Sequence, residues 1–334
     1  MGIASLILCL HIFMIFFSFE VSSQTCSVKS APKERPTKKF NKVNKSFLNG
    51  TVFHELHVKD AMECGLSCLQ EDLCASYNMA RKPSPGLRYI CALLSMRIGD
   101  LGAELVKNDT FDHFSTKFHC YADNGRDASD FCVGTCRDIK LRHPPAPSGY
   151  YVIDPSGDLG EPPFPVFCDM MSHNGIGVTV VGHDSEARTH VNGYKDPGSY
   201  SRDITYNFTS VTQLKELTTR SNYCEQFIKY ECKGSSLYYY PGGNWFNWWV
   251  SRDGHKMTSW GGAPTGSNKC ACGVTGTCAN PAYRCNCSSN DGTWREDSGL
   301  LTDKDTLPVI QLRAGDTDAS TEDGYITLGK LMCY

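Results

Sequence analysis

The sequence lacks the patterns by which most enzymes are recognised. Its 334 residues contain no Gly-x-Ser-x-Gly nucleophile elbow, no phosphate-binding glycine loop and no Cys-x-x-Cys redox pair. The segment His54-Glu-Leu-His57 resembles the start of a zinc-protease motif, but that motif needs its two histidines four residues apart. We therefore expect a protein without catalysis, without a cofactor and without a metal centre.

An excess of charge is also missing. The chain has 33 basic and 36 acidic residues, a net charge of −3, so the whole molecule is not expected to bind nucleic acid. After the N-terminal segment, no stretch approaches the roughly 20 apolar residues that span a bilayer. The sequence thus predicts a chain with no membrane span.

The N-terminal segment has the layout of a cleaved secretory signal. Residues 2–19 are almost all apolar, and Val21 and Ser23 occupy the −3 and −1 places before Gln24. No Lys or Arg precedes the apolar run, so a retained signal anchor is the alternative. We expect residues 1–23 to be a signal peptide and the mature protein to be secreted, extracellular and soluble.

Cysteine is abundant: 17 of the 18 remain after the signal peptide is removed with Cys9. Closely spaced thiols at 270–287 would suggest zinc in the cytosol, but disulfides are favoured in a secreted chain. A polar stretch at 121–135 separates the cysteines into two groups, which predicts two domains joined by a linker. The cysteines expected to form disulfides are Cys26, Cys64, Cys68, Cys74, Cys91, Cys120, Cys136, Cys168, Cys224, Cys232, Cys270, Cys272, Cys278, Cys285, Cys287 and Cys333.

The first domain contains one well-marked helix. Asp60 and Glu63 have the spacing of a capping box, and Cys64 and Cys68 would share one helical face. Segments 74–79 and 89–94 are predicted to form strands. The Asp-Ala-x-x-Cys-x-x-x-Cys helix and the strands after it resemble the PAN/apple family. The resemblance implies an α+β domain over 24–120 that binds proteins or carbohydrates without a catalytic site.

The resemblance also implies a disulfide pairing. It joins Cys64 to Cys91 and Cys68 to Cys74, with an outer bond from Cys26 to Cys120. Six cysteines taken alone allow fifteen pairings.

A basic arm lies near the start of this domain. We consider it a candidate site for sulfated polyanions, with a solvated, flexible arm as the alternative. Its basic residues are Lys29, Lys33, Arg35, Lys38, Lys39, Lys42 and Lys45.

The second domain, 136–334, opens with two predicted strands around an Asp-Pro-Ser-Gly turn. A bond from Cys136 to Cys168 would close this hairpin. Pro147-Ser-Gly-Tyr-Tyr and Cys168-Asp-Met resemble the opening of the fibrinogen C-terminal domain, which implies an α+β fold here as well.

The remainder departs from ordinary fibrinogen-like domains. Trp248-Trp-Val-Ser-Arg, Cys270-Ala-Cys-Gly and Leu328-Gly-x-Leu-x-Cys333 resemble the fibrinogen-like segment of the contactin-associated proteins of the neurexin superfamily. A secreted PAN module joined to such a module is similar to cnidarian proteins, some of them from the organic matrix of coral skeleton. This resemblance implies an adhesion or matrix role.

The other cysteines can be paired by counting. Cys224 and Cys232 are expected to bond, and the six from 270 to 333 form an even set. Cys132, in the linker, is left over. We expect it to form an interchain disulfide in a homodimer, with another intrachain pairing or capping by a small thiol as alternatives.

Two further features bear on binding. Asn290 and Asp291 are the only remnants of the calcium loop of fibrinogen-like domains, too few for a tight site. The aromatic segment 238–249 is a candidate for ligand contact, although most of it is expected to be core, and of Trp248 and Trp249 one should point inward.

Together these features predict an α+β, disulfide-rich, two-domain glycoprotein of the extracellular matrix. Its expected partners are extracellular proteins or glycans; the alternative is a soluble lectin acting through the fibrinogen-like domain. The N-glycosylation acceptors are Asn44, Asn49, Asn108, Asn207 and Asn286, the last of which lies between two cysteines that could block it.

Overall fold

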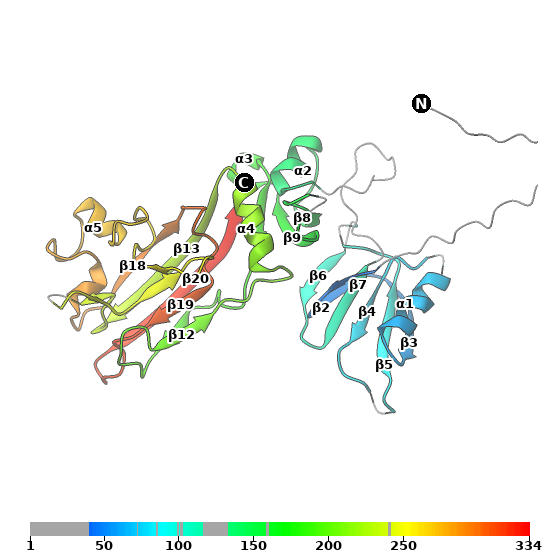
Figure 1. Ribbon diagram of the computed structural model, residues 1–334, viewed down its shortest axis with the longest axis horizontal. Helices are drawn as coiled ribbons and strands as arrows, with labels where there is room; N and C mark the ends of the chain where they lie inside the picture. The colour runs from blue at the N-terminus through cyan, green and yellow to red at the C-terminus, as the bar shows by residue number, and fades with distance from the viewer. Residues whose placement is uncertain are drawn as a thin grey trace, which may run out of the picture. The chain divides into compact units, whose positions relative to one another are not determined.

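The computed structural model describes two blocks of the chain. The N-terminal block is residues 40–115 without 72, 85, 99, 101 and 102, and the C-terminal block is residues 133–334 without 158, 159, 240 and 241. Both are mostly β-sheet; the described N-terminal block has one helix and the C-terminal block has several short ones, and seven disulfides join cysteines within the two blocks (Figure 1). Among the helices of these two blocks, none has the length and hydropathy needed to cross a membrane.

Several predictions concern residues outside the two blocks. The signal peptide, the bond between Cys26 and Cys120, and the unpaired Cys132 all lie outside the described residues. They remain predictions.

The N-terminal block is an antiparallel five-stranded sheet, in the order β1-β7-β4-β5-β3, with one helix and a two-stranded ribbon of β2 and β6. The elements are β1 (Asn41–Val43), β2 (Ser46–Asn49), β3 (Val52–Val58), α1 (Ala61–Gln70), β4 (Ser76–Ala80), β5 (Tyr89–Leu94), β6 (Glu104–Lys107) and β7 (Phe111–Ser115). Strands β4 and β5 pair at the places predicted from the sequence.

Helix α1 begins where the sequence predicts. The Asp60 side chain accepts a hydrogen bond from the Glu63 backbone N–H at 2.9 Å, which satisfies one free donor of the first turn. The reciprocal bond of a capping box is displaced by one residue, because Glu63 Oε2 accepts from Lys59 N and not from Asp60 N. Cys64 and Cys68 are buried on one face and bond to Cys91 and Cys74, the pairs that the PAN/apple resemblance implies.

A buried polar group stabilises the sheet behind the helix. Asn78 on β4 exchanges two hydrogen bonds with the Leu48 backbone, both at 3.0 Å. His113 on β7 is fully buried, and its Nδ1 lies 2.9 Å from Asn78 Oδ1. Burial lowers the pKa of His113 to about 3, so the imidazole is neutral at physiological pH.

The C-terminal block contains a seven-stranded antiparallel sheet in the order β18-β13-β20-β10-β9-β8, with β11 also paired to β20. The same block also contains a four-stranded sheet, in the order β12-β19-β16-β17, and a two-stranded ribbon of β14 and β15. The strands are β8 (Gly149–Ile153), β9 (Phe164–Asp169), β10 (Val178–Val181), β11 (Thr189–Val191), β12 (Tyr200–Asp203), β13 (Cys224–Lys233), β14 (Tyr238–Tyr239), β15 (Asn244–Trp245), β16 (Trp248–Val250), β17 (Lys256–Met257), β18 (Arg295–Leu301), β19 (Gln311–Ala314) and β20 (Asp323–Cys333). The helices are α2 (Cys136–Arg142), α3 (Ser172–Gly175), α4 (Val211–Arg220), α5 (Ala271–Thr275) and the 3₁₀-helix η2 (Asn286–Ser289).

The central strands β13 and β20 alternate between buried and half-buried residues. Ile228 and Tyr230 on β13, with Ile326 and Leu328 on β20, point into the core. The alternate residues make the opposite, polar face of the sheet. At the far end of this sheet β8 and β9 form the predicted hairpin, and Cys136–Cys168 connects α2 to β9 instead of joining the two strands.

The disulfides of the second half correct the pairing obtained by counting. Cys224 does not bond to Cys232, because both lie on strand β13 about 26 Å apart, and a disulfide requires Cα atoms within about 7 Å. Cys224 bonds instead to Cys333, which is directly opposite on β20, and Cys232 bonds to Cys287 in η2. The six cysteines from 270 to 333 are therefore not a closed set.

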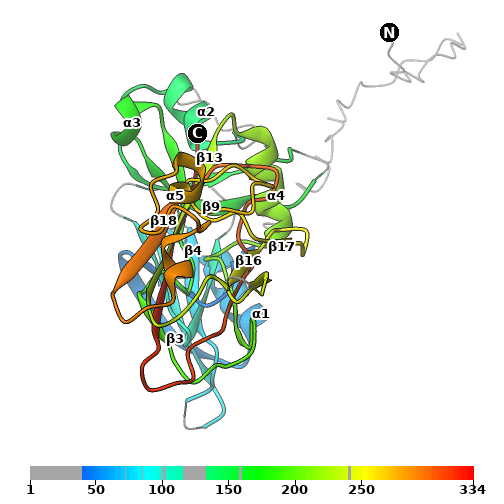
Figure 2. The same cartoon turned by 90° about the vertical axis from the view of Figure 1, so that its left-hand side faces the viewer.

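A short disulfide-rich loop covers one edge of the block. Cys270–Cys285 and Cys272–Cys278 hold α5 and η2 beside β18 (Figure 2). The core beneath contains Trp260, fully buried, whose Nε1 donates to the Asp297 carbonyl at 3.0 Å. Two disulfide-closed loops thus stabilise residues 270–289, which contain only two short helices.

Candidate functional site

The polar face of the large sheet carries a group of aromatic and charged side chains. His190 on β11 and Glu231 on β13 lie opposite Tyr325 on the intervening strand β20. The rings of His190 and Tyr325 stack with centroids 4.6 Å apart and planes at 20°. We name this group the Tyr325 cluster; its members are Arg188, His190, Glu231, Trp294, Asp323 and Tyr325.

Charges in the Tyr325 cluster are paired across strands. The Arg188 guanidinium carbon lies 3.3 Å from the Tyr325 ring centroid, and its Nε and Nη2 donate to Glu231 at 2.8 and 3.2 Å. These bonds lower the pKa of Glu231 below its usual range, so the carboxylate is ionised at neutral pH. His190 Nε2 lies 2.6 Å from Asp323 Oδ1. The face therefore carries an Arg–carboxylate ion pair next to a His–carboxylate contact.

Trp294 extends the cluster toward the solvent. It directly precedes β18, is 48% exposed, and its ring centroid lies 5.9 Å from that of Tyr325. An exposed indole beside paired charges offers an apolar surface together with hydrogen-bond donors and acceptors. This combination suits an uncharged ligand with both C–H faces and hydroxyls, or a protein surface of mixed polarity.

Sequence reasoning missed this cluster. Its members are distributed from residue 188 to residue 325, and strand pairing alone brings them together. The register of β13 with β20, and of β20 with β11, could not be read from the sequence.

The described residues of the aromatic segment 238–249, which was the sequence candidate, include both core and accessible rings; Tyr239 is 43% exposed. Tyr238 and Trp249 are buried, and Trp249 Nε1 donates to the Ser259 carbonyl at 2.9 Å. Trp248 is half-buried on the opposite side of β16, with the Lys256 Nζ 3.7 Å from its ring centroid. The expectation that one of the consecutive tryptophans is core is confirmed.

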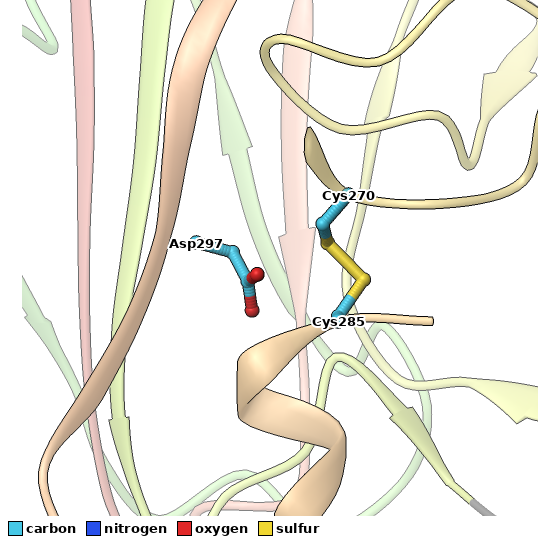
Figure 3. Close-up of side chains that lie close together, drawn as sticks. All are labelled: Cys270, Cys285 and Asp297. Carbon is cyan, nitrogen blue, oxygen red and sulfur yellow. A yellow bond between two sulfur atoms is a disulfide. The ribbon is translucent and has the colours of Figure 1, made fainter. Parts of the chain in front are cut away.

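One buried group has the geometry of a metal site but not the chemistry. The side chains of Cys270, Cys285 and Asp297 lie within 4.8 Å of one another (Figure 3). The two sulfurs are joined in a disulfide and have no thiolate to offer. Asp297 instead accepts from the backbone N–H groups of Asn286 and Cys287, at 3.0 and 2.8 Å, and so anchors η2 to β18.

Asp297 carries an electrostatic cost in this position. Its side chain is almost fully buried, and burial raises its pKa to about 6 despite the two N–H bonds. Asp316, which accepts from Ser236 N at 2.8 Å, also has its pKa raised to about 6 by burial. Both carboxyls are ionised at pH 7 in surroundings that favour the neutral form.

The remnants of a calcium loop are engaged elsewhere. Asp291 accepts from Arg295 Nη2 at 2.7 Å and from Thr293 N at 3.1 Å. Asn290 adopts a left-handed conformation at the end of η2, with φ at 43°. This arrangement ends a helix and forms an ion pair, and it does not gather the oxygens that calcium prefers.

Most of the basic arm lies outside the described residues. Lys29, Lys33, Arg35, Lys38 and Lys39 are in that part of the chain, whereas Lys42 and Lys45 belong to the N-terminal block. Lys42 Nζ lies 2.7 Å from Asp112 Oδ2, and Lys45 Nζ lies 3.5 Å from Asp109 Oδ1. These two lysines therefore form ion pairs within the domain while their side chains stay exposed.

The glycosylation acceptors differ in accessibility. Asn44 and Asn49 are exposed, and Asn108 and Asn207 are half-buried. Asn286 is held at both ends of its amide: Nδ2 donates to the Glu296 carbonyl at 3.0 Å, and Oδ1 accepts from Ala279 N at 2.9 Å.

We expect Asn286 to be unglycosylated in the folded protein and Asn44 and Asn49 to be occupied. A glycan on Asn286 would break the bond to Glu296, and Ser288 of the same acceptor triplet is buried. Peptide mass mapping after enzymatic deglycosylation in heavy-oxygen water measures the occupancy of each site. Full occupancy of Asn286 would contradict this geometry.

Comparison with known proteins finds partial similarities. The fibrillar collagen C-terminal domain family matches residues 126–244. Neurexin-4 of Drosophila melanogaster is 40% identical over 187 residues, which are 54% of this chain and 14% of that protein. Contactin-associated protein 1 of Mus musculus and that of Homo sapiens are each 37% identical over 187 residues, 56% of this chain and 13% of theirs. The chain thus spans about one seventh of the length of these relatives.

Proposed function

We propose that this chain is a secreted, glycosylated adhesion or matrix protein that binds extracellular proteins or glycans without catalysis. In this proposal residues 24–120 are a PAN/apple domain, 121–135 a linker and 136–334 a fibrinogen C-terminal-like domain. The observation that carries the proposal is the disulfide-linked C-terminal block, which presents the Tyr325 cluster and is similar to segments of neurexin-4 and contactin-associated protein 1.

Features of the N-terminal block support the assignment of residues 24–120 to a PAN/apple domain. Helix α1 packs on an antiparallel sheet and is fixed to it by Cys64–Cys91 and Cys68–Cys74. This is the arrangement that the PAN/apple resemblance implies.

A finer proposal concerns the tissue. Because a secreted PAN module joined to this fibrinogen-like type resembles cnidarian proteins, we propose a component of the organic matrix of a mineralised skeleton. In this proposal the basic arm, from Lys29 to Lys45, contacts sulfated polyanions, and Cys132 links two copies.

A soluble lectin is the second candidate, and one observation favours it. The Tyr325 cluster places an exposed indole beside an Arg–carboxylate ion pair and a His–carboxylate contact, and so offers hydrogen-bonding groups next to an apolar ring. A neutral saccharide could stack on Trp294 and hydrogen-bond to the paired groups.

Replacement of Trp294 by alanine tests the cluster in both candidates. Loss of the exposed ring should weaken binding to immobilised matrix extract or neutral glycans about tenfold, the equivalent of about 1.4 kcal/mol. Surface plasmon resonance with the full secreted chain measures the change. Tyr223→Ala, which removes another exposed ring, is the matched control. Equal binding by the two variants would exclude the cluster as the contact surface.

Secretion itself is tested by expressing the full chain in eukaryotic cells. We expect the protein in the medium with Gln24 as its first residue, which N-terminal sequencing establishes. Recovery only in the membrane pellet with residues 1–23 attached would support a signal anchor and contradict the proposal.

A further inference from the structure

The four-stranded sheet of the C-terminal block has one face on the core and one face on the outside. Trp249 and Leu312 point inward and are buried, so Trp248 on β16 and Arg313 on β19 point outward. Trp248 and Arg313 are direct partners in the strand register and lie side by side. Lys256 on β17 shares this face, because its Nζ lies 3.7 Å from the Trp248 ring centroid. We name Trp248, Lys256 and Arg313 the Trp248 site.

The indole of the Trp248 site is held in one position. Gly198, in the loop before β12, has φ at 66°, and a Cβ there would overlap the Trp248 ring, so the ring fills space that only glycine leaves. Arg313 Nη1 donates to the Gly198 carbonyl at 3.2 Å, and Arg313 Nε donates to Gln311 Oε1 at 2.6 Å. The ring and the guanidinium are thus positioned before a ligand arrives, which lowers the entropy lost on binding.

The two cations of the Trp248 site have no carboxylate partner. Among the described residues, none forms an ion pair with Lys256 or Arg313. In the four strands of this sheet only Asp203 is acidic, and it accepts a hydrogen bond from Gln311 Nε2. Burial lowers the pKa of Lys256, and no neighbouring carboxylate opposes this effect. The outer face of the sheet therefore carries positive charge that the protein does not neutralise.

Charged groups next to these strands do not remove the excess. The loop before β12 adds one charge of each sign, Lys195 and Asp196. Asp253, before β17, is engaged by Lys215 Nζ at 2.9 Å. The positive charge thus stays concentrated at the two cations of the Trp248 site.

This arrangement fits an anion that also has an apolar face. Strand β16 separates β19 from β17, so the two cations originate about 10 Å apart across the sheet, with the indole between them. A ligand that contacts all three needs negative groups on both sides of an apolar surface. The rings of a sulfated or carboxylated sugar chain provide that surface between their charged groups, whereas an acidic peptide has no such ring between its carboxylates.

We propose that the Trp248 site binds an anionic saccharide. The inference rests on the proposed function in taking an extracellular glycan as the ligand, and it deepens that function by giving the glycan a negative charge. It does not depend on the Tyr325 cluster, which belongs to the other sheet, or on the basic arm.

Isothermal titration calorimetry of the full secreted chain with a heparin-derived hexasaccharide tests the site. The basic residues from Lys29 to Lys39 are replaced by glutamine in every sample, so that the arm does not contribute. We expect Lys256→Gln and Arg313→Gln each to raise the dissociation constant at least about fivefold, because each removes a charge-assisted contact. Arg142→Gln, which removes an exposed cation on α2, is the matched control and should change it less than about twofold.

Two results of this titration would overturn the proposal. Equal weakening by all three variants would show that net charge alone attracts the saccharide. No measurable binding of the hexasaccharide would show that the sheet face is not a saccharide site. Neither result bears on the Tyr325 cluster, because the Trp294→Ala measurement with neutral glycans tests that cluster separately.

Two further probes identify the charged group and the class of ligand. A hyaluronan hexasaccharide carries carboxylates without sulfates. Binding as tight as that of the heparin fragment assigns the site to carboxylated sugars, and weaker binding assigns it to sulfated ones. Octaglutamate that binds as tightly as the better saccharide would overturn the choice of a sugar and indicate an acidic protein partner.

Trp248→Phe locates the contact. The heparin hexasaccharide should change the tryptophan emission of the original chain, and the variant should lose most of that change. Because phenylalanine keeps a ring at this position, the dissociation constant should stay within about threefold. An emission change that persists in Trp248→Phe would place the ligand elsewhere and contradict the proposal, and circular dichroism checks that each variant is folded.

Discussion

Replacing both Cys224 and Cys333 with alanine is expected to lower the free energy of unfolding of the C-terminal block by about 4 kcal/mol. The bond closes a loop with a sequence separation of 109, the longest of the described disulfides. The effective loop is shorter, because Cys232–Cys287 remains intact inside it. Guanidinium unfolding followed by tryptophan fluorescence reports on this block alone, since all five tryptophans lie between 245 and 294.

The matched control is the double alanine variant of Cys272 and Cys278. This bond closes a loop with a separation of only six, and the chain-entropy argument gives about 2 kcal/mol for its loss. A larger effect for the short loop than for Cys224–Cys333 would show that strand pairing between β13 and β20, and not the cross-link, fixes the ends of the block.

The second large expected effect is that acid acts in opposite directions on two buried side chains, His113 in the N-terminal block and Asp297 in the C-terminal block. For His113, burial lowers the folded-state pKa to about 3, below the ordinary value of about 6.5 in the unfolded chain. The unfolded state therefore takes up the proton first, and stability falls as the pH drops below 6.5. Between pH 7 and pH 4 the N-terminal block should lose about 3 kcal/mol.

The pKa of Asp297 is raised by burial, and protonation of Asp297 therefore favours the folded state. Its folded-state pKa of about 6 lies above the unfolded value of 3.8, so the folded state takes up the proton first. Its contribution to stability is complete below pH 4 and is lost as the pH rises through 6. Between pH 7 and pH 4 the protonation of Asp297 alone should therefore contribute up to about 2 kcal/mol of stability to the C-terminal block, and Asp316 acts in the same direction. Carboxyls whose folded-state pKa is lowered, such as Asp184 and Glu231, act in the opposite direction.

Two measurements on the full chain separate these effects. Hydrogen exchange of peptides from β4 and β7 follows the N-terminal block, and tryptophan fluorescence follows the C-terminal block. His113→Asn should make the first block less sensitive to acid, and Asp297→Asn should make the second block lose more stability on acidification than the unchanged chain does. A pH dependence that neither variant changes would contradict the assigned burial of these two side chains.

Local features of the fold were readable from the sequence. The cap at Asp60, the helical face shared by Cys64 and Cys68, and the strands β4 and β5 depend on neighbours within a few residues. Their patterns survive in the structure because tertiary packing reinforces the local preference. The hairpin of β8 and β9 was predicted for the same reason.

Long-range features were not readable. The bond between Cys224 and Cys333 depends on the register of β13 against β20, and adjacent spacing favoured the wrong partner, Cys232. The Tyr325 cluster depends on the same register with β11 added. The number of cysteines does not show which strands pair or in what register, because every possible pairing contains the same number of disulfides.

Packing decides which of the side chains singled out from the sequence remain accessible. In the aromatic segment 238–249, Trp249 fills the core, whereas Tyr239 is exposed and Trp248 is half-buried. The closely spaced cysteines at 270–287 and Asp297 resemble metal ligands, but disulfide formation consumes the thiols. Composition indicates which chemistry is available, whereas packing decides which atoms remain free.

A sequential extraction of native tissue tests the proposed matrix function most directly. The protein would be followed by mass spectrometry through saline, high salt, reducing denaturant and finally acid or chelator dissolution of any mineral. The account predicts recovery only in the reducing and mineral-dissolving fractions, as expected of a cross-linked matrix component. Complete recovery in plain saline would contradict a matrix role and leave the soluble lectin.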